Sequence, residues 1–334
     1  MTTSSPKISI AGVDAGPGGA GDPGILAALT APEPERLLEA RDRLLRLGAA
    51  AGSSDETFAR YQATLYALHE RRDMATAARR AWLAAEAYPG DESRVADCDW
   101  PRALPLDAFH AHVDGLLSMR GRLGSEMSEY LFSSKQAPAW EAARLYILHH
   151  WYRSRRFYDL VGTFAMRTPL DDVGPLNENL AVETGALPGT RPHPRMLDDL
   201  LTYFRLPERD QDHPALPIAW AYVNNRHRCV RTIHSAWGLA LLYSLEFTTT
   251  ETHTNVHNML ERVGAPPEAR AFHALHMVSD TEHAAGIWQA GHSAVADLEG
   301  QRIFLRSLAE QQRLSRAYFG AIWQTIQQTV MAKS

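Results

Sequence analysis

The sequence predicts an all-α protein, and two observations carry this prediction. From Pro34 to the end of the chain, apolar residues recur mainly at i, i+3 and i+4, which is the spacing of one helix face. Alternating runs of Val, Ile and Thr, which would indicate strands, do not occur in the sequence. Clusters of Gly, Pro and Asp divide the pattern into predicted helices near 35–48, 54–70, 74–87, 106–121, 126–134, 138–165, 195–204, 215–248, 252–263, 267–290 and 293–331.

The composition along the chain predicts three parts. Residues 1–34 are rich in Gly, Pro, Ser and Ala and have no periodic apolar pattern, which indicates a flexible N-terminal arm. A linker from Asp97 to Leu106 contains Pro101 and Pro105. This linker separates a predicted N-terminal helical extension at 35–100 from a main helical bundle at 101–334.

The overall composition excludes several classes of protein. The chain has 334 residues, of which 45% are hydrophobic and 22% charged, so it is long enough to bury a core without disulfides. Its two cysteines, Cys98 and Cys229, lie far apart in the sequence and cannot supply a thiolate metal site. Any bound metal would therefore be held by nitrogen and oxygen ligands. The formal net charge of −5 also argues against nucleic-acid binding, which needs a dense cationic surface.

A membrane partner is not expected either. The most apolar stretch, Trp237 to Leu245, is too short to cross a bilayer. The polar residues Met1 to Lys7 are not followed by the apolar segment of a secretory signal. We therefore expect a cytoplasmic protein, and the sequence leaves its oligomeric state open, a homodimer included.

One segment has the spacing of metal ligands. His276, Asp280 and His283 stand at i, i+4 and i+7, so on a helix they form a single stripe about 10 Å long. Three side chains on such a stripe can reach one small volume. The alternative is that they decorate the solvated face of an amphipathic helix, because the periodicity does not tell which side faces solvent.

Three further residues are informative beside this stripe. Glu246 ends an apolar run that begins at Trp237, where an ionised carboxylate is costly unless it is paired or coordinated. The alternative is that the helix ends there and Glu246 emerges into water. Glu183 and His193 flank a Gly- and Pro-rich turn, which places one near the end of a helix and the other at the start of the next.

The order of these residues along the chain resembles that of the metal ligands in the heme-oxygenase-like diiron oxidases and oxygenases. The matching residues are Glu183, His193, Glu246 and the segment from His276 to His283. Members of this family are all-α proteins whose core helices supply three histidines and three carboxylates. The resemblance covers roughly residues 110–290. It implies a heme-oxygenase-like helical bundle that binds two Fe2+ ions and uses O2 as a cosubstrate.

The resemblance also implies a division of the ligands. Glu183, His193 and His283 would hold one iron, and the other would be held by Glu246, His276 and Asp280. A nitrogen and oxygen set without thiolate suits Fe(II). Because histidine binds metal only when neutral, we expect activity to fall as the pH drops through about 6.

Several neighbours are further candidates for the same site. Some relatives that oxygenate amines use an additional carboxylate from the helix before the first Glu, and Asp159 and Glu141 are the candidates here. The doublet His149-His150 is either one core and one exposed histidine or a contact to the metal ligands or substrate. His273, one turn before His276, competes with it as a ligand.

The resemblance implies a free amino acid or a fatty acid as substrate. The carboxylate of an amino-acid substrate would need an arginine. Arg226, Arg228 and Arg231 precede Glu246, and Arg231 is the candidate. On a straight helix, however, Arg231 would lie about 22 Å from Glu246, which is too far for a small substrate that touches the irons. The ordinary alternative is a solvated basic face.

The sequence thus predicts a non-heme diiron enzyme that oxidises a small amino acid with O2 in natural-product biosynthesis. C–H functionalisation, such as desaturation or cyclisation, and N-oxygenation of an amine both remain open. The alternative is a metal-independent heme-oxygenase-like protein, either a binding protein or a thiaminase-like hydrolase with Cys229 as its nucleophile. In a third interpretation, a structural zinc or helical interaction protein, the candidate ligands never converge.

Overall fold

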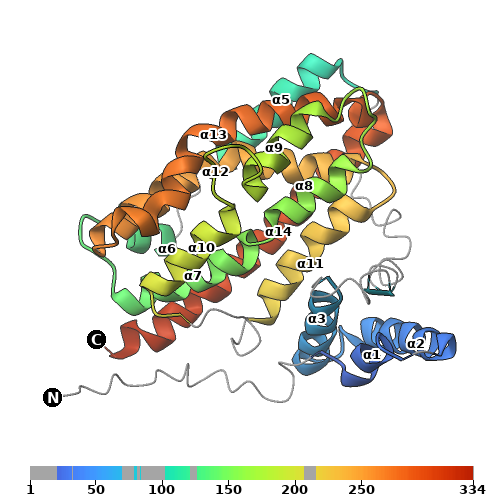
Figure 1. The fold of residues 1–334 in the computed structure, drawn as a ribbon, viewed down its shortest axis with the longest axis horizontal. Helices are drawn as coiled ribbons and strands as arrows, with labels where there is room; N and C mark the ends of the chain where they lie inside the picture. The colour runs from blue at the N-terminus through green and yellow to red at the C-terminus, as the bar shows by residue number, and fades with distance from the viewer. Residues whose placement is uncertain are drawn as a thin grey trace.

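The computed structural model describes residues 21–31, 33–69, 79–80, 83, 102–120, 126–206 and 216–333. Within these ranges the side chains of residues 119–120 and 279–281 are not described. The described residues form helices and no strand, as the sequence predicts (Figure 1). None of the helices in these ranges combines the length and the apolar character that a membrane span requires.

Three short helices at the N-terminal end share a small core of their own. They are α1 (Pro23–Ala28), α2 (Pro34–Ala50) and α3 (Asp55–His69). Ile25, Leu44 and Leu65 are buried between them, and the helices lie together at one end of the molecule beside α11 (Figure 1). The predicted flexible arm at 1–34 is therefore wrong in its last part, where α1 forms. Residues 1–20 of that arm lie outside the described residues.

A local cap explains why α1 forms. The Asp22 carboxylate accepts hydrogen bonds from the backbone N–H of Gly24 and Ile25, at 3.0 and 3.1 Å. It also pairs with Arg43 of α2 at 2.8 Å. An acidic N-cap satisfies the first amides of a helix, and this one also ties the helix to its neighbour.

The extension contacts the bundle through α3 and α11 (Pro217–Arg231). Asn224 of α11 donates from Nδ2 to the backbone oxygen and to Oε1 of Gln62, at 2.9 and 2.8 Å. Arg156 donates to the carbonyl of His69 at 3.0 Å. The predicted helix at 74–87 and most of the linker from Asp97 to Leu106 lie outside the described residues.

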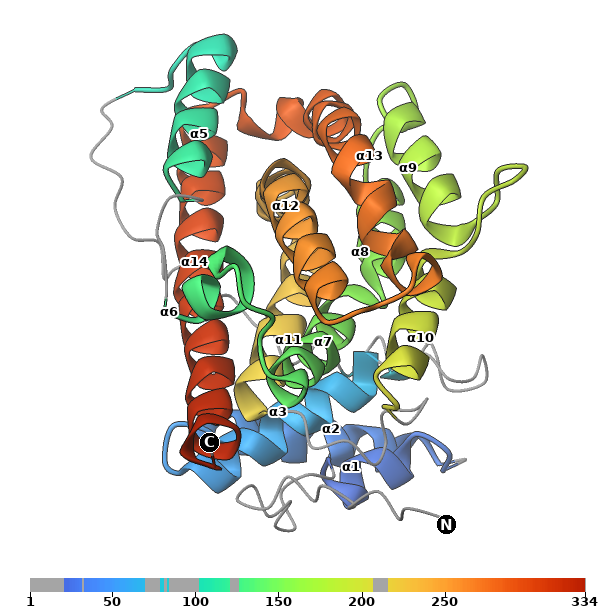
Figure 2. The same ribbon diagram turned by 90° about the vertical axis from the view of Figure 1, so that its left-hand side faces the viewer.

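The remaining helices form the bundle, in which α12 lies between α13 and the long α14 (Figure 2). Two apolar clusters fill it, one around Tyr146 and Phe204 and one around Trp237 and Phe304. The elements are α5 (Leu106–Arg120), α6 (Glu126–Ser128), η3 (Glu129–Ser133), α7 (Trp140–Ser154), α8 (Phe157–Ala165), α9 (Gly174–Thr184), α10 (His193–Tyr203), α11, α12 (Ala236–Arg262), α13 (Pro267–Gly291), η5 (His292–Val295), α14 (Leu298–Thr329) and η6 (Met331–Lys333).

The observed helices differ from the predicted ones at four places. The segment predicted at 138–165 is two helices, α7 and α8, and the one at 215–248 is broken between Arg231 and Ala236. A helix at 174–184 was not predicted by the periodicity. Conversely, α12 continues through the threonine run after Glu246, where Thr248 and Thr254 bond their hydroxyls to the carbonyls four residues back.

A tight turn joins α12 and α13 into an antiparallel hairpin. Gly264 adopts a φ of 81° between the two helices, a conformation that glycine allows without strain. The hairpin is the most extensive helix pair among the described elements. It sets Glu246 opposite His283 and His253 opposite His276, so residues far apart in the sequence face one another.

Candidate metal centre

Glu183 and His193 meet because a glycine lets the chain turn back on itself. At the end of α9, Gly185 has a φ of 67°, and the N–H of Ala186 donates to the carbonyl of Ala181 at 2.8 Å. A Cβ on Gly185 would lie 2.5 Å from the nitrogen of Pro192. The loop therefore returns close enough for His193, the first residue of α10, to stand beside Glu183.

Three predicted ligands converge at this point. His193 Nδ1 lies 2.8 Å from Glu183 Oε2, and His276 Nε2 lies 3.8 Å from Glu183 Oε1. Ligand atoms of these three residues lie within 4.8 Å of one another, and all three side chains are buried. The two imidazole rings are 4.6 Å apart between centroids. Three helices, α9, α10 and α13, thus supply one cluster.

A backbone carbonyl orients His276. Its Nδ1–H donates to the carbonyl of Phe272 at 2.8 Å, one turn earlier on α13. This bond places the proton on Nδ1 and leaves Nε2 as the electron-pair donor that faces Glu183. Orientation of a ligand histidine by a carbonyl bond at its other nitrogen is typical of metal sites.

The electrostatics of the cluster keep Glu183 ionised. Burial alone would raise its pKa, but the imidazoles of His193 and His276 outweigh that effect and lower the pKa to about 2. A carboxylate at 3% exposure therefore carries its charge at neutral pH. A buried negative charge needs compensation by a cation or by protonated partners.

A second carboxylate and histidine pair faces the first from the α12–α13 hairpin. Glu246 Oε1 lies 3.8 Å from His283 Nδ1, and Asn179 Nδ2 donates to the same oxygen at 3.1 Å. Glu246 is 3% exposed in the middle of α12, so the alternative in which it emerges into water is wrong. Asn179 stands one turn before Glu183, so α9 contacts both pairs.

In the structure His276 approaches Glu183, and His283 approaches Glu246. The resemblance implies another division of the ligands, in which His283 shares an iron with Glu183 and His276 shares the other iron with Glu246. That division stays a prediction. Asp280 lies between the two histidines on α13, and its side chain lies outside the described residues.

The remaining candidates occupy several positions. His273 contacts His253, with their Nδ1 atoms 2.9 Å apart, and is not in the three-residue group found among the described side chains. His149 and His150 are both buried, so the interpretation with one exposed histidine is wrong. Asp159 lies in the first turn of α8 with a buried Oδ2, and Glu141 is exposed in the first turn of α7.

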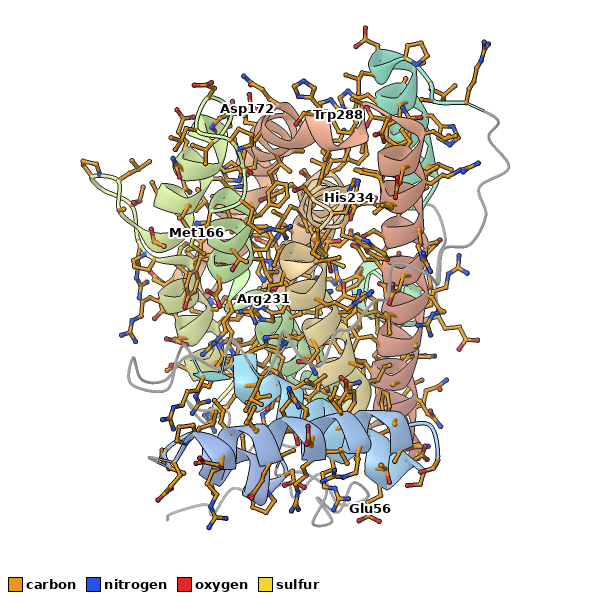
Figure 3. The ribbon with its side chains drawn as sticks, turned by 90° about the vertical axis from the view of Figure 1, so that its right-hand side faces the viewer. Glu56, Met166, Asp172, Arg231, His234 and Trp288 are labelled. Carbon is orange, nitrogen blue, oxygen red and sulfur yellow. The ribbon has the colours of Figure 1, made fainter. Side chains whose placement is uncertain are left out.

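Arg231 does not reach the cluster. It contacts Nδ1 of His69, at the junction between α11 and the N-terminal helices. Figure 3 shows Arg231 between Glu56 at one end of the molecule and Trp288 near the other. The predicted substrate contact of Arg231 is therefore replaced by an interdomain contact.

Unpaired polar atoms test whether the cluster fits a metal. Among the described residues, Nε2 of His193 and Oε1 of Glu183 are buried and have no hydrogen bond. Buried polar groups are nearly always satisfied, so such a group of atoms calls for a ligand. One carboxylate with two imidazoles is a donor set that suits Fe(II). The residues therefore fit an iron site.

A cavity of about 540 Å³ opens onto this centre. Glu183, His276 and Glu246 line it together with His150 and His253. The lining farther away includes apolar residues such as Phe132 and Phe319. A partly apolar cavity with a few convergent polar groups is typical of a small-molecule site.

The fold and the site together define a class, an all-α protein with a buried cluster of histidines and a carboxylate that could hold a metal ion beside a cavity. A sequence-family profile described as iron-containing redox enzyme matches residues 144–315. The match covers more than half of the chain and spans every residue of the centre. The chain belongs to the iron-containing redox enzyme family. No curated protein matches the chain at a significant level.

Two residues of the site were missed in the sequence. Asn179 stands one helical turn before Glu183, and His253 stands two turns after Glu246, so both share a face with a predicted ligand. The i+4 and i+7 spacings were the available signal. The predicted helix boundary after residue 248 hid the second of them.

Proposed function

We propose that the protein is a non-heme diiron enzyme that uses O2 to oxidise a small amino acid in natural-product biosynthesis. The observation that carries this proposal is the presence of two buried carboxylate and histidine pairs, of which Glu183, His276 and Glu246 line one cavity. A single-metal site would use only one of these pairs. Membership of an iron-containing redox family supports the choice of iron.

The residues of the two pairs have distinct tasks in this proposal. Glu183, His193 and His276 would hold one iron, with His276 fixed by the Phe272 carbonyl. Glu246 and His283 would hold the other, and Asp280 completes the set by its place in the sequence. When bound, the two ferrous ions supply the electrons that reduce O2.

The chain's own residues then confine the substrate and exclude water. The Asn179 bond holds one oxygen of Glu246, and Glu246 lines the cavity. The stacked rings of His253 and His276, 4.5 Å apart, close the side toward α13. C–H functionalisation and N-oxygenation of an amine are both compatible with this arrangement.

The thiaminase-like alternative has no support in the geometry. Cys229 is fully buried, and burial raises the pKa of its thiol to about 11. Cys229 Sγ lies 3.9 Å from Ser307 Oγ, and no hydrogen bond between Cys229 and a histidine or carboxylate is found among the described residues. It also does not line the cavity. A nucleophile must be exposed to substrate and readily deprotonated, and Cys229 is neither.

The test is O2 uptake by protein that has been loaded anaerobically with Fe(II), in the presence of each of the twenty amino acids. We expect one or a few of them to trigger uptake, and His276→Ala to abolish it. Cys229→Ala should leave uptake unchanged. Loss of activity in Cys229→Ala alone, with His276→Ala active, would favour the hydrolase instead.

A further inference from the structure

Two arginines line the same cavity as Glu183 and Glu246. Arg153 comes from α7 and Arg226 from α11, and both line the cavity. Arg226 is only 6% exposed, and Arg153 is partly buried. Guanidinium groups remain charged at any physiological pH, so the cavity lining here carries two positive charges.

Both guanidinium groups contact only neutral partners. Arg226 donates to the carbonyl of Arg153 at 2.6 Å and to the hydroxyl of Tyr222 at 2.9 Å. Arg153 donates to Nδ1 of His150 at 2.7 Å and to the hydroxyl of Tyr146 at 3.2 Å. Among the described residues, neither arginine forms an ion pair with a carboxylate. Nε of Arg226 is buried and has no hydrogen bond.

The next arginine of α11 shows how unusual this is. Arg228 is as deeply buried as Arg226, but it forms an ion pair with Glu310 and donates to Asn225 Oδ1 at 2.7 Å. A buried charge without a counter-charge is costly, and proteins normally provide one. The missing anion beside Arg153 and Arg226 is therefore best explained as a ligand.

A short chain of imidazole rings connects this pair with the metal centre. Arg153 bonds Nδ1 of His150, whose ring lies 6.0 Å from that of His253. His253 in turn stacks on His276 at 4.5 Å. Because His150 accepts a bond at Nδ1, it is neutral and adds no counter-charge. His150, His253 and His276 therefore connect an anion bound at the arginines with the proposed iron site.

We propose that Arg153 and Arg226 form a carboxylate-binding subsite of this cavity. The subsite holds the carboxylate end of the substrate while the rest of the molecule extends toward Glu183 and His276. Two forked guanidinium groups match the planar shape of a carboxylate, and the apolar lining around Phe319 suits a carbon chain. This inference rests on the proposed function in one respect, that the bound carboxylate belongs to the substrate.

The test is ligand binding to the metal-free protein, measured by calorimetry and by thermal shift. The probes are hexanoate, L-norleucine, hexanamide and inorganic phosphate. We expect hexanoate or L-norleucine to bind at least about tenfold more tightly than hexanamide, since the amide lacks the charge that strengthens the bonds to arginine. Binding of only one of the two acids tells whether an α-amino group is required.

The variants Arg153→Gln and Arg226→Gln should each weaken carboxylate binding by about tenfold or more. Arg231→Gln is the matched control, because Arg231 lies on the same helix but does not line the cavity. The proposal would be overturned if hexanoate and hexanamide bound equally well, or if phosphate bound more tightly than both carboxylic acids. A loss of carboxylate binding in Arg231→Gln would also overturn it. If a variant fails to fold, the affinities of hexanoate and hexanamide for the unmodified chain still test the proposal.

These measurements need no iron, so they separate the two proposals. Carboxylate binding together with failure to bind two irons would leave the subsite standing and remove the proposed function. Binding of two irons without carboxylate binding would leave the proposed function standing and remove the subsite.

Discussion

Glu246 and His283 face each other across the α12–α13 hairpin, with Glu246 Oε1 3.8 Å from His283 Nδ1. The carboxylate is buried, and its one hydrogen bond from a side chain comes from Asn179. We expect Glu246→Gln to lower the iron content from two ions to one per chain and to abolish O2 consumption, because a neutral amide is a poor iron ligand. Metal analysis after anaerobic loading measures the first effect and an oxygen electrode the second.

Glu261→Gln is the control for this variant. Glu261 lies on the same helix, is exposed, and pairs with Arg270 at the surface. It should keep both irons and full activity. Retention of two irons by Glu246→Gln would contradict the assignment of Glu246 as a ligand.

His193→Phe tests the first cluster through stability as well as metal content. Nε2 of His193 is buried without a hydrogen bond among the described residues, whereas its Nδ1 lies 2.8 Å from Glu183 Oε2. We expect the variant to lose one iron and its free energy of unfolding without metal to change by no more than about 2 kcal/mol, because the substitution removes an unsatisfied buried nitrogen and the Glu183 contact together. His112→Ala, at an exposed position of α5, should change neither quantity. A large loss of stability without metal would mean that His193 is structural.

Gly185→Ala should separate Glu183 from His193. A Cβ there would lie 2.5 Å from the nitrogen of Pro192, and the φ of 67° disfavours any side chain. Gly189→Ala is the matched control, since Gly189 has a φ of 80° but no atom within 4 Å of the added Cβ. Both variants should cost about 1–2 kcal/mol for the backbone conformation. Only Gly185→Ala should also weaken iron binding, and equal iron affinities in a metal titration would refute this account of the turn.

Acid should destabilise the metal-free protein through its buried histidines. Burial, with repulsion from Arg153, lowers the pKa of His149 to about 3 from the ordinary value of 6.5. Between these values the unfolded chain binds a proton that the folded chain does not, so stability falls as the pH drops below about 6.5. One such group contributes a slope of up to about 1.4 kcal/mol per pH unit.

His149→Phe should remove that part of the slope and keep the ring contact with Tyr318. Urea unfolding at several pH values between 7.5 and 4.5 measures the difference. Identical slopes for the variant and the parent chain would show that His149 does not remain neutral in the fold.

Much of the fold could be predicted from the sequence, because helical periodicity reports which residues are buried. The main exception concerns α12, where the threonine run after Glu246 was taken as a break. Packing of α12 on α13 overrides the low helix propensity of threonine, and the threonine hydroxyls are satisfied within the helix, as in the bond from Thr248 to the Ser244 carbonyl at 2.6 Å.

Those parts of the candidate site that lie on one helix, or on two helices joined by a short turn, could be predicted from the spacing of residues in the sequence. Glu183 and His193 across one turn, and His276 with His283 on one helix face, are local patterns. The pairing of His276 with Glu183, and the approach of Arg153 to the cavity, depend on how α7, α9 and the hairpin pack. No local spacing encodes those distances, so they required the three-dimensional structure.

The central claim is that Glu183 and Glu246 belong to two adjacent iron sites in one chain. Its most direct test is anaerobic titration of the metal-free protein with Fe(II), followed by metal analysis and Mössbauer spectroscopy. The account predicts saturation close to two irons per chain, with a spectrum of two nitrogen- and oxygen-ligated ferrous ions. Saturation at one iron, or tight binding of a single zinc in preference, would contradict it.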